Sequence, residues 1–270
     1  MEGGYWVIRT LVSGKVVERS KFFTGKRRPR TRKKGSTSLA QKDRNMNTAV
    51  RQLARGLNCN MENSWIFLTL TYDEEHLPKT VEEAWKALTL FIRRLRRRGV
   101  DMKGFWITAD KSKKGTPTRL HHHMVIDGSG IGIQQTLDKS VAVINDGDAL
   151  QDVWGNGFVY AEPVEDQIDR TPLAAYLVRQ AADEPGKKKW RASLGLKKPV
   201  VKSEEIVDRA GELHIPPGAE VSEIGHYDEE TGSQYVRYIP AEKTQVEREY
   251  IGFDWLNGPY AREMLDGEEL

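Results

Sequence analysis

The segment GFWITADKSKKGTPTRLHHHMVID, residues 104–127, decides the fold that this sequence predicts. Apolar and β-branched residues fill both of its ends, and a polar stretch with Lys, Gly and Pro lies between them. This pattern predicts a β-hairpin with one strand at 104–110 and a second at 120–127. The second strand carries three of the six histidines of the chain, which are His121, His122 and His123.

The three consecutive histidines predict two different environments. Side chains alternate along a strand, so His121 and His123 are expected on one face and His122 on the other. Two imidazoles on one face, two residues apart, can share a divalent metal ion and leave coordination positions open for a substrate oxygen. The alternatives are a surface patch and a structural hydrogen-bond network.

The residues around the hairpin predict further strands and helices. We expect a hairpin at 5–23, strands at 65–73 and 157–164, and helices at 38–58, 80–99, 148–155 and 169–183. The helix at 80–99 has a capping box, formed by Thr80 and Glu83. The order of elements predicts an α+β fold with a central, largely antiparallel β-sheet and helices packed on it.

The chain is expected to have three regions. Residues 1–35 would form N-terminal strands and a basic arm, residues 36–203 the main domain, and residues 204–270 an acidic appendage. The appendage contains short strand-like pieces, at 234–240 and 247–253.

The formal net charge of +3 hides a strong asymmetry along the chain. Residues 1–60 carry 15 Lys and Arg against 3 Asp and Glu, whereas residues 201–270 carry 6 against 17. The densest basic block, KRRPRTRKK at 26–34, is either a solvated arm or an arm that binds nucleic-acid phosphates. The candidate DNA-binding residues are Lys26, Arg27, Arg28, Arg30, Arg32, Lys33 and Lys34, together with Arg93 and Arg97 of the expected helix 80–99.

The distribution of apolar residues and cysteine bears on the cellular compartment. The sequence has no apolar run close to the roughly 20 residues that span a bilayer, and it shows no secretory signal pattern. Its single cysteine, Cys59, excludes a disulfide framework within the chain. We therefore expect a cytoplasmic protein without a membrane partner.

Tyr176 lies in the middle of the expected helix 169–183, with Arg179 and Gln180 three and four residues later on the same face. One interpretation is a core aromatic residue. The other is a nucleophile whose phenol is activated by Arg179 or by a metal ion. Tyr160, in the preceding strand, is expected to be a packing residue.

Three segments stand in a specific order: FLTLTY at 67–72, HHHMVID at 121–127 and YLVRQ at 176–180. Together they resemble the HUH endonuclease superfamily, and within it the rolling-circle replication initiators of bacterial plasmids and phages. The resemblance covers roughly residues 20–205. It implies a central antiparallel sheet of ferredoxin-like or RRM-like architecture, with His121 and His123 on a middle strand and the Tyr176 helix over that face.

The resemblance also implies a reaction on single-stranded or hairpin origin DNA in a bacterial host cell. Mg²⁺ or Mn²⁺ held by His121 and His123 would polarise the scissile phosphate. Tyr176 would attack it, leaving a free 3′-hydroxyl and a 5′-phosphotyrosine link. Host replication proteins such as a helicase and a polymerase would be further partners.

The sequence departs from this superfamily at two positions. Arg179 stands where the family usually has Lys, and Arg holds its charge in a planar fork. The strand before the histidines has Ala109 where the family normally has a carboxylate. Asp110 is the candidate third metal ligand, if a bulge turns it to the histidine face.

Other functions remain open from the sequence. A single-tyrosine transposase or a mobilisation relaxase would share the site and read different DNA. A DNA-binding origin marker or repressor would lack nicking activity. A metal-dependent phosphohydrolase would cleave without using Tyr176.

Overall fold

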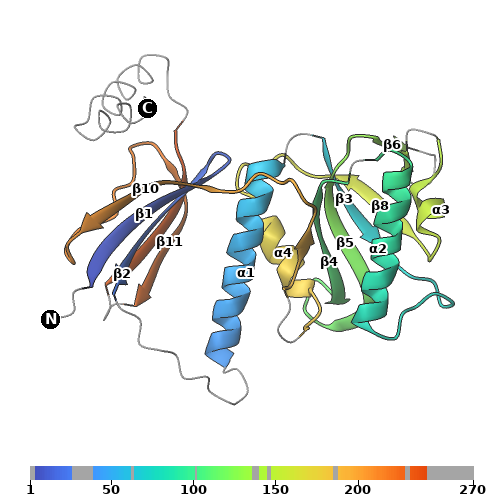
Figure 1. Ribbon diagram of the computed structural model, residues 1–270, viewed down its shortest axis with the longest axis horizontal. Helices are drawn as coiled ribbons and strands as arrows, with labels where there is room; N and C mark the ends of the chain where they lie inside the picture. Colours follow the sequence, from blue (N-terminus) through green and yellow to red (C-terminus); the bar gives the residue numbers. More distant parts are fainter. Residues whose placement is uncertain are drawn as a thin grey trace, which may run out of the picture.

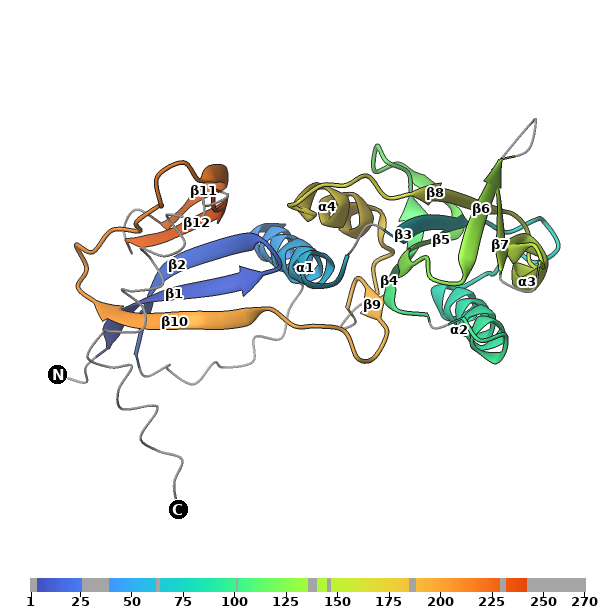
Figure 2. The same cartoon turned by 90° about the horizontal axis from the view of Figure 1, so that it is seen from above.

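The computed structural model describes residues 4–25, 39–61, 64–100, 102–135, 140–144, 147–184, 188–228 and 232–241. It contains two five-stranded antiparallel sheets, with helices α1 (Leu39–Asn60) and α4 (Thr171–Gln180) between them (Figures 1 and 2). The predicted α+β fold is confirmed. Within the described ranges, we find no helix that combines the length and apolar character needed to cross a membrane.

The sheet that we call the central sheet carries the histidines. Its spatial order is β8 (Val159–Pro163), β3 (Trp65–Leu70), β5 (Pro117–Asp127), β4 (Gly104–Lys111) and β9 (Arg191–Ala192). The predicted hairpin at 104–127 is confirmed, because β4 and β5 pair with Ala109 opposite His121. The histidine strand β5 is therefore the middle strand and has a neighbour on both sides.

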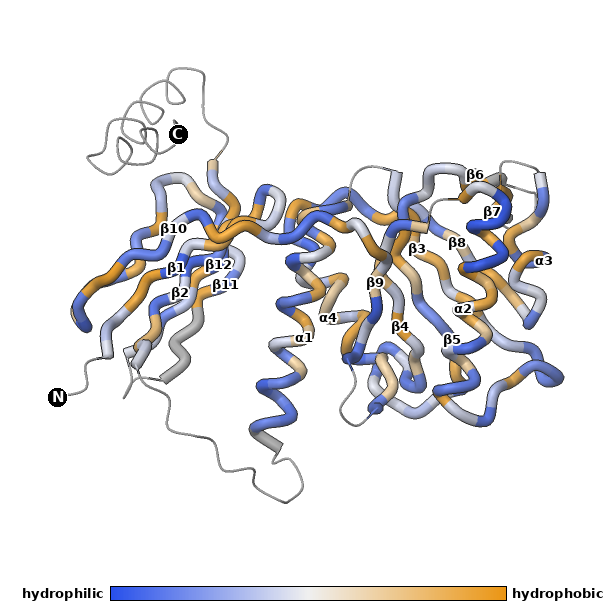
Figure 3. The backbone as a smooth tube through the Cα atoms, in the orientation of Figure 1, coloured by the Kyte–Doolittle hydropathy of each residue, from blue (hydrophilic) through white to orange (hydrophobic). Residues whose placement is uncertain are grey.

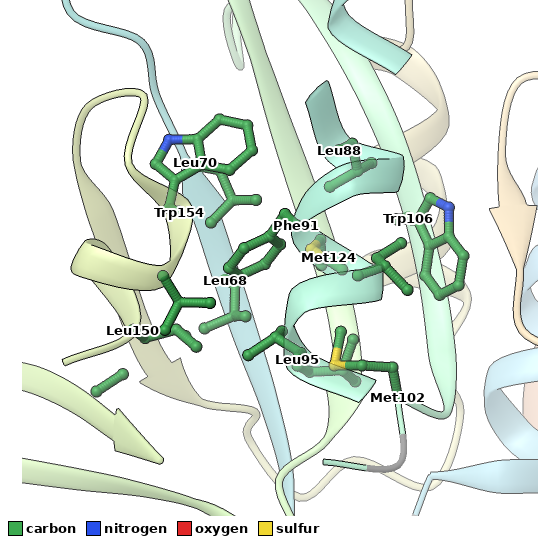
Figure 4. Packing of buried hydrophobic residues seen from close by; sticks show 14 of the residues in the cluster. Leu68, Leu70, Leu88, Phe91, Leu95, Met102, Trp106, Met124, Leu150 and Trp154 are labelled. Carbon is green, nitrogen blue, oxygen red and sulfur yellow. The ribbon is translucent and has the colours of Figure 1, made fainter. Parts of the chain in front are cut away.

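One face of the central sheet is covered by α2 (Val81–Arg97) and α3 (Leu150–Trp154). The predicted capping box of α2 is present, since the Glu83 backbone N–H donates to Thr80 Oγ1 at 3.1 Å. Leu88, Phe91 and Leu95 of α2 are almost fully buried against this face (Figure 4). The hairpin of β6 (Ile131–Gln135) and β7 (Ser140–Ile144) adds to the same core.

The other face of the central sheet is covered by α4, and α1 packs on α4. Leu53 and Leu57 of α1 are fully buried, whereas the hydrophilic first half of that helix is largely exposed (Figure 3). At Gly56 a Cβ atom would lie 2.7 Å from the Phe105 ring, so the glycine permits close approach of α1 to the sheet.

The sheet that we call the terminal sheet joins segments from both ends of the described chain. Its spatial order is β10 (Val200–Val207), β1 (Tyr5–Ser13), β2 (Val16–Thr24), β12 (Ser233–Ile239) and β11 (Glu220–Asp228). Figure 1 shows strands from both ends of the colour scale side by side. The structure thus combines segments that the sequence analysis assigned to separate regions, 1–35 and 204–270. The basic block 26–34 and the strand-like piece 247–253 lie outside the described residues.

A nearly buried ion pair joins the terminal sheet to α1. The Arg55 guanidinium donates to both carboxylate oxygens of Glu18, at 2.9 and 2.6 Å, and the Glu18 side chain is only 6% exposed. Tyr235 of β12 donates its hydroxyl proton to the same carboxylate at 3.0 Å. The hydrogen bond with Glu18 raises the pKa of Arg55, so this guanidinium stays charged.

We expect Arg55→Ala to lower the free energy of unfolding by roughly 3 kcal/mol, because it leaves the Glu18 charge buried without its main partner. The matched control is Arg9→Ala, which removes an exposed ion pair with Glu204 and should cost about 1 kcal/mol or less. Urea titration measures both variants. Equal losses would contradict a special role for the Glu18 pair.

Candidate active site

His121 and His123 lie on the face of β5 that α4 covers, and their Nε2 atoms are 3.1 Å apart. The carbonyl oxygen of Arg119 accepts a hydrogen bond from Nδ1 of His121 at 2.9 Å. Nδ1 of His123 lies 3.0 Å from the Thr69 hydroxyl of the neighbouring strand β3. These oxygen partners at Nδ1 orient both rings so that their Nε2 atoms converge.

The pair has the donor chemistry of a metal site. Burial lowers the pKa of His123 to about 4, the neighbouring His121 adds to this effect, and the Gln180 side chain opposes it. A neutral imidazole with its proton on Nδ1 presents a lone pair at Nε2, as metal binding requires. Two nitrogens that bind one ion at right angles lie about 3 Å apart when each metal–nitrogen distance is about 2.1 Å. The observed separation of the two Nε2 atoms therefore fits a divalent ion.

The structure does not complete a three-residue cluster around the pair. Within the ranges described above, no group of three His, Cys, Asp or Glu side chains is placed to hold a metal ion. Ala109 lies opposite His121 and is fully buried. Asp110 falls where the β4–β5 pairing shifts between Ala109 and Lys111, and its Oδ1 atom makes no hydrogen bond. The expected irregularity is present at Asp110, but this residue does not join His121 and His123 in a cluster.

Tyr176 on α4 lies directly over this face of β5. Its ring centroid is 5.8 Å from that of His123 and 6.1 Å from that of Phe67, and its side chain is partly exposed. The structure therefore brings the Tyr176 ring beside His123. Arg179 is exposed on the same helix, three residues further on.

Gln180 and Thr69 are two site residues that sequence reasoning did not select. The Gln180 side chain is buried, its Nε2 donates to the Tyr176 carbonyl at 3.2 Å, and it also hydrogen-bonds His123. Its spacing of four residues from Tyr176 placed it on the same helical face in the sequence but indicated no role at the site. Thr69 gives no such signal, because its place depends on the β3–β5 register that sets it opposite His123.

A pocket of about 510 Å³ opens beside Tyr176. Its wall combines aromatic, apolar, basic and acidic groups, among them Phe67, Leu173, Lys113, Arg170, Glu162 and Glu165. Such a mixed lining suits a ligand that has both flat apolar surfaces and charged groups.

His122 points to the opposite face of β5 and has a structural role there. It is fully buried, with Nε2 2.7 Å from the Tyr72 hydroxyl and Nδ1 3.1 Å from the Thr108 hydroxyl. Burial, with smaller contributions from His121 and His123, lowers the pKa of His122 to about 3. The structural-network alternative therefore describes His122, whereas His121 and His123 form the candidate site.

The predicted DNA-binding residues of α2 lie away from this site. Arg93 and Arg97 are exposed on a helix that covers the face of the central sheet opposite the imidazole pair. The remaining candidates, Lys26, Arg27, Arg28, Arg30, Arg32, Lys33 and Lys34, lie outside the described residues.

Residues 65–183 match the ORF2 family model of replication-associated proteins. This part of the chain is similar to replication-associated proteins. The match runs from the start of β3 to the end of the α4 region, so it contains the imidazole pair and Tyr176. It spans less than half of the chain and leaves the terminal sheet outside. No curated protein and no solved structure matches this chain.

We expect acidification to destabilise the fold through His122 and His123, whose folded pKa values lie below the unfolded value of about 6.5. The unfolded chain then binds more protons, so stability is full above pH 6.5 and is lost as the pH falls toward 4. Between pH 7 and pH 5.5, the titration of each of these two histidines should lower the free energy of unfolding by about 1 kcal/mol.

Urea titration in EDTA tests this pH dependence. His122→Gln should roughly halve the loss, because it keeps a polar side chain near Tyr72 but removes one titrating group. His214→Gln, at an exposed histidine between β10 and β11, is the matched control and should leave the loss unchanged. An identical pH dependence in His122→Gln and the parent would contradict the assignment.

Proposed function

We propose that this protein is a rolling-circle replication initiator that nicks and rejoins single-stranded or hairpin origin DNA through a 5′-phosphotyrosine on Tyr176. The observation that carries the proposal is the Tyr176 ring beside His123, whose Nε2 converges with that of His121. The similarity of residues 65–183 to replication-associated proteins supports it. Host replication proteins would use the released 3′ end.

The proposed reaction is a balanced transfer of a phosphodiester. The Tyr176 oxygen forms a bond to phosphorus, and the bond between phosphorus and the 3′-oxygen breaks. The phenol proton passes to solvent, and the released 3′-oxygen takes up a proton. Attack by that 3′-hydroxyl on the phosphotyrosine reverses the transfer and joins the strand.

The chain's own residues position this reaction. Phe67 and His123 contact the Tyr176 ring, so they restrict the direction from which the Tyr176 oxygen can reach a phosphate. Arg179, exposed one turn after Tyr176, can place a positive charge near the phosphate. Mg²⁺ or Mn²⁺, held by His121 and His123, would supply Lewis-acid polarisation of a phosphate oxygen.

Gln180 and Asp110 are the candidates for a further oxygen donor at the imidazole pair. Gln180 is buried beside His123, and its Nε2 donates to the Tyr176 carbonyl at 3.2 Å. Oxygen donors suit Mg²⁺ and Mn²⁺. We favour Gln180 in this role, since Asp110 lies at an irregular position of β4 with Lys111 Nζ 3.5 Å from its Oδ1.

We expect Mn²⁺ at about 100 times its dissociation constant to stabilise the wild type by about 2.7 kcal/mol, because the pair exists only in the folded chain. His121→Ala and His123→Ala should lose most of this stabilisation. His76→Ala, an exposed histidine elsewhere, is the matched control and should keep it. Urea titration with Mn²⁺ or EDTA measures the difference, and full stabilisation of His121→Ala would contradict the site.

We expect wild type with Mn²⁺ to form a covalent adduct with single-stranded oligonucleotides tiled across the DNA that flanks its own gene. Denaturing gels should show no adduct in Tyr176→Phe, because the attacking oxygen is gone, and little in His121→Ala. Tyr5→Phe, on the terminal sheet, is the control and should form the adduct normally. Hydrolysis that survives in Tyr176→Phe would contradict the proposal and indicate a metal-dependent phosphohydrolase.

A second candidate is a DNA-binding origin marker or repressor without nicking activity. Ala109, at the position where a carboxylate ligand is expected, is the observation that favours it. Specific DNA binding without an adduct in any divalent ion would support this function. A single-tyrosine transposase or relaxase would form the same adduct, on transposon-end or transfer-origin DNA instead.

A further inference from the structure

Two aromatic side chains stand exposed at the edge of the central sheet. Phe158 and Tyr160 are 53% and 61% exposed, and β8 is an edge strand. The prediction from the sequence that Tyr160 is a packing residue is wrong, because its side chain is exposed. An exposed pair of large aromatic residues along one sheet edge is a candidate binding surface.

The strand register places Tyr160 on the same face as the imidazole pair. Tyr160 lies opposite Thr69, and Thr69 lies opposite His123. Directly opposed residues of antiparallel strands point to the same face. The 3.0 Å contact between Thr69 and His123 confirms this for the inner pair, so Tyr160 occupies the outer end of the same row.

The residues on either side of Tyr160 extend this surface along β8. Glu162 lies opposite Phe67 and lines the pocket beside Tyr176. The Thr71 N–H donates to the Phe158 carbonyl at 2.9 Å, which continues the ladder one residue beyond β8. Alternation then gives Phe158 the same face as Tyr160, about 7 Å away along the strand.

In the part of the neighbouring β6–β7 hairpin that the structure describes, the buried residues Ile131, Ala142 and Ile144 belong to the core on the α2 side of the sheet. The face with Phe158 and Tyr160 is the opposite one, toward α4. Figure 2 shows β8 at the margin of the central sheet, running from beside β6 and β7 toward the α4 side.

We propose that Phe158 and Tyr160 form a stacking platform for unpaired bases of the DNA strand that flanks the scissile phosphate. The inference rests on the proposed function for the identity of its ligand. Every base has a π-face, and base–aromatic stacking contributes to single-strand binding without a strong sequence preference.

Two exposed cations near this surface can contact the backbone of a single strand. Lys113 lines the pocket at the Tyr176 end, together with Glu162 and Glu165, and Arg119 lies beside His121. Cationic side chains position phosphates while aromatic rings stack bases. Duplex DNA keeps its bases stacked inside the helix, so the platform should select single strands.

Fluorescence anisotropy with a labelled 12-nucleotide oligo(dT) tests the platform. All proteins carry Tyr176→Phe and the buffer contains EDTA, so the result depends on neither nicking nor metal. We expect Phe158→Ala and Tyr160→Ala each to weaken binding about fivefold or more. Tyr160→Phe keeps the ring and should restore the affinity. Tyr5→Ala, which removes a similarly exposed aromatic residue on the terminal sheet, is the matched control.

Three results would overturn the platform. One is a Phe158→Ala, Tyr160→Ala double variant that binds oligo(dT) with the same affinity as the parent. Its circular dichroism spectrum must be unchanged, so that the comparison concerns a folded protein. The second is an equal loss of affinity for a 12-base-pair duplex, which would indicate a general surface effect. Loss of affinity in Tyr160→Phe as in Tyr160→Ala would also contradict stacking, because it would assign the effect to the hydroxyl. If the aromatic variants lose affinity for oligo(dT), the stacking platform is supported even where no covalent adduct forms. The platform and the nicking function can therefore be contradicted independently.

Discussion

The register of β5 in the middle of the central sheet is the constraint on which the candidate site depends. His122 is locked on one face by hydrogen bonds with Tyr72 and Thr108 in a fully buried environment. A slip of one residue would bury His121 and His123 in the α2 core and turn His122 toward α4. The buried polar network therefore determines which imidazoles face Tyr176.

Burial also sets the chemical state of the imidazoles. Desolvation is the largest cause of the lowered pKa of His123, and the same holds for His122. A neutral imidazole can bind a metal ion on the α4 face, as we propose for His123, and it serves as a hydrogen-bond partner on the α2 face. One physical effect thus serves a proposed catalytic role and a structural role on adjacent residues of one strand.

Local sequence patterns predicted the parts of the fold that depend on local chemistry. The 104–127 hairpin and the capped helix α2 follow from residue alternation and from the Thr80–Glu83 capping box. The terminal sheet could not be predicted in this way, because it pairs β1 with β10 across most of the chain. Strand pairing over that separation leaves no signature in a short window.

The site shows the same division between local and long-range information. Alternation along β5 predicted that His121 and His123 share a face, and the 3.1 Å between their Nε2 atoms agrees with it. The exposure of Tyr160 and the position of Thr69 depend on which strands are neighbours, and one strand's sequence does not contain that information. Gln180 was on the expected helical face, but its contact with His123 needed the packing of α4 on the sheet.

The most direct test of the central claim is to locate the DNA on the protein. The covalent complex formed with Mn²⁺ would be digested with nuclease and trypsin, and the nucleotide-bearing peptide would be sequenced by mass spectrometry. The account predicts a residual 5′-phosphate link on Tyr176. A link on any other residue, Tyr160 included, would contradict it.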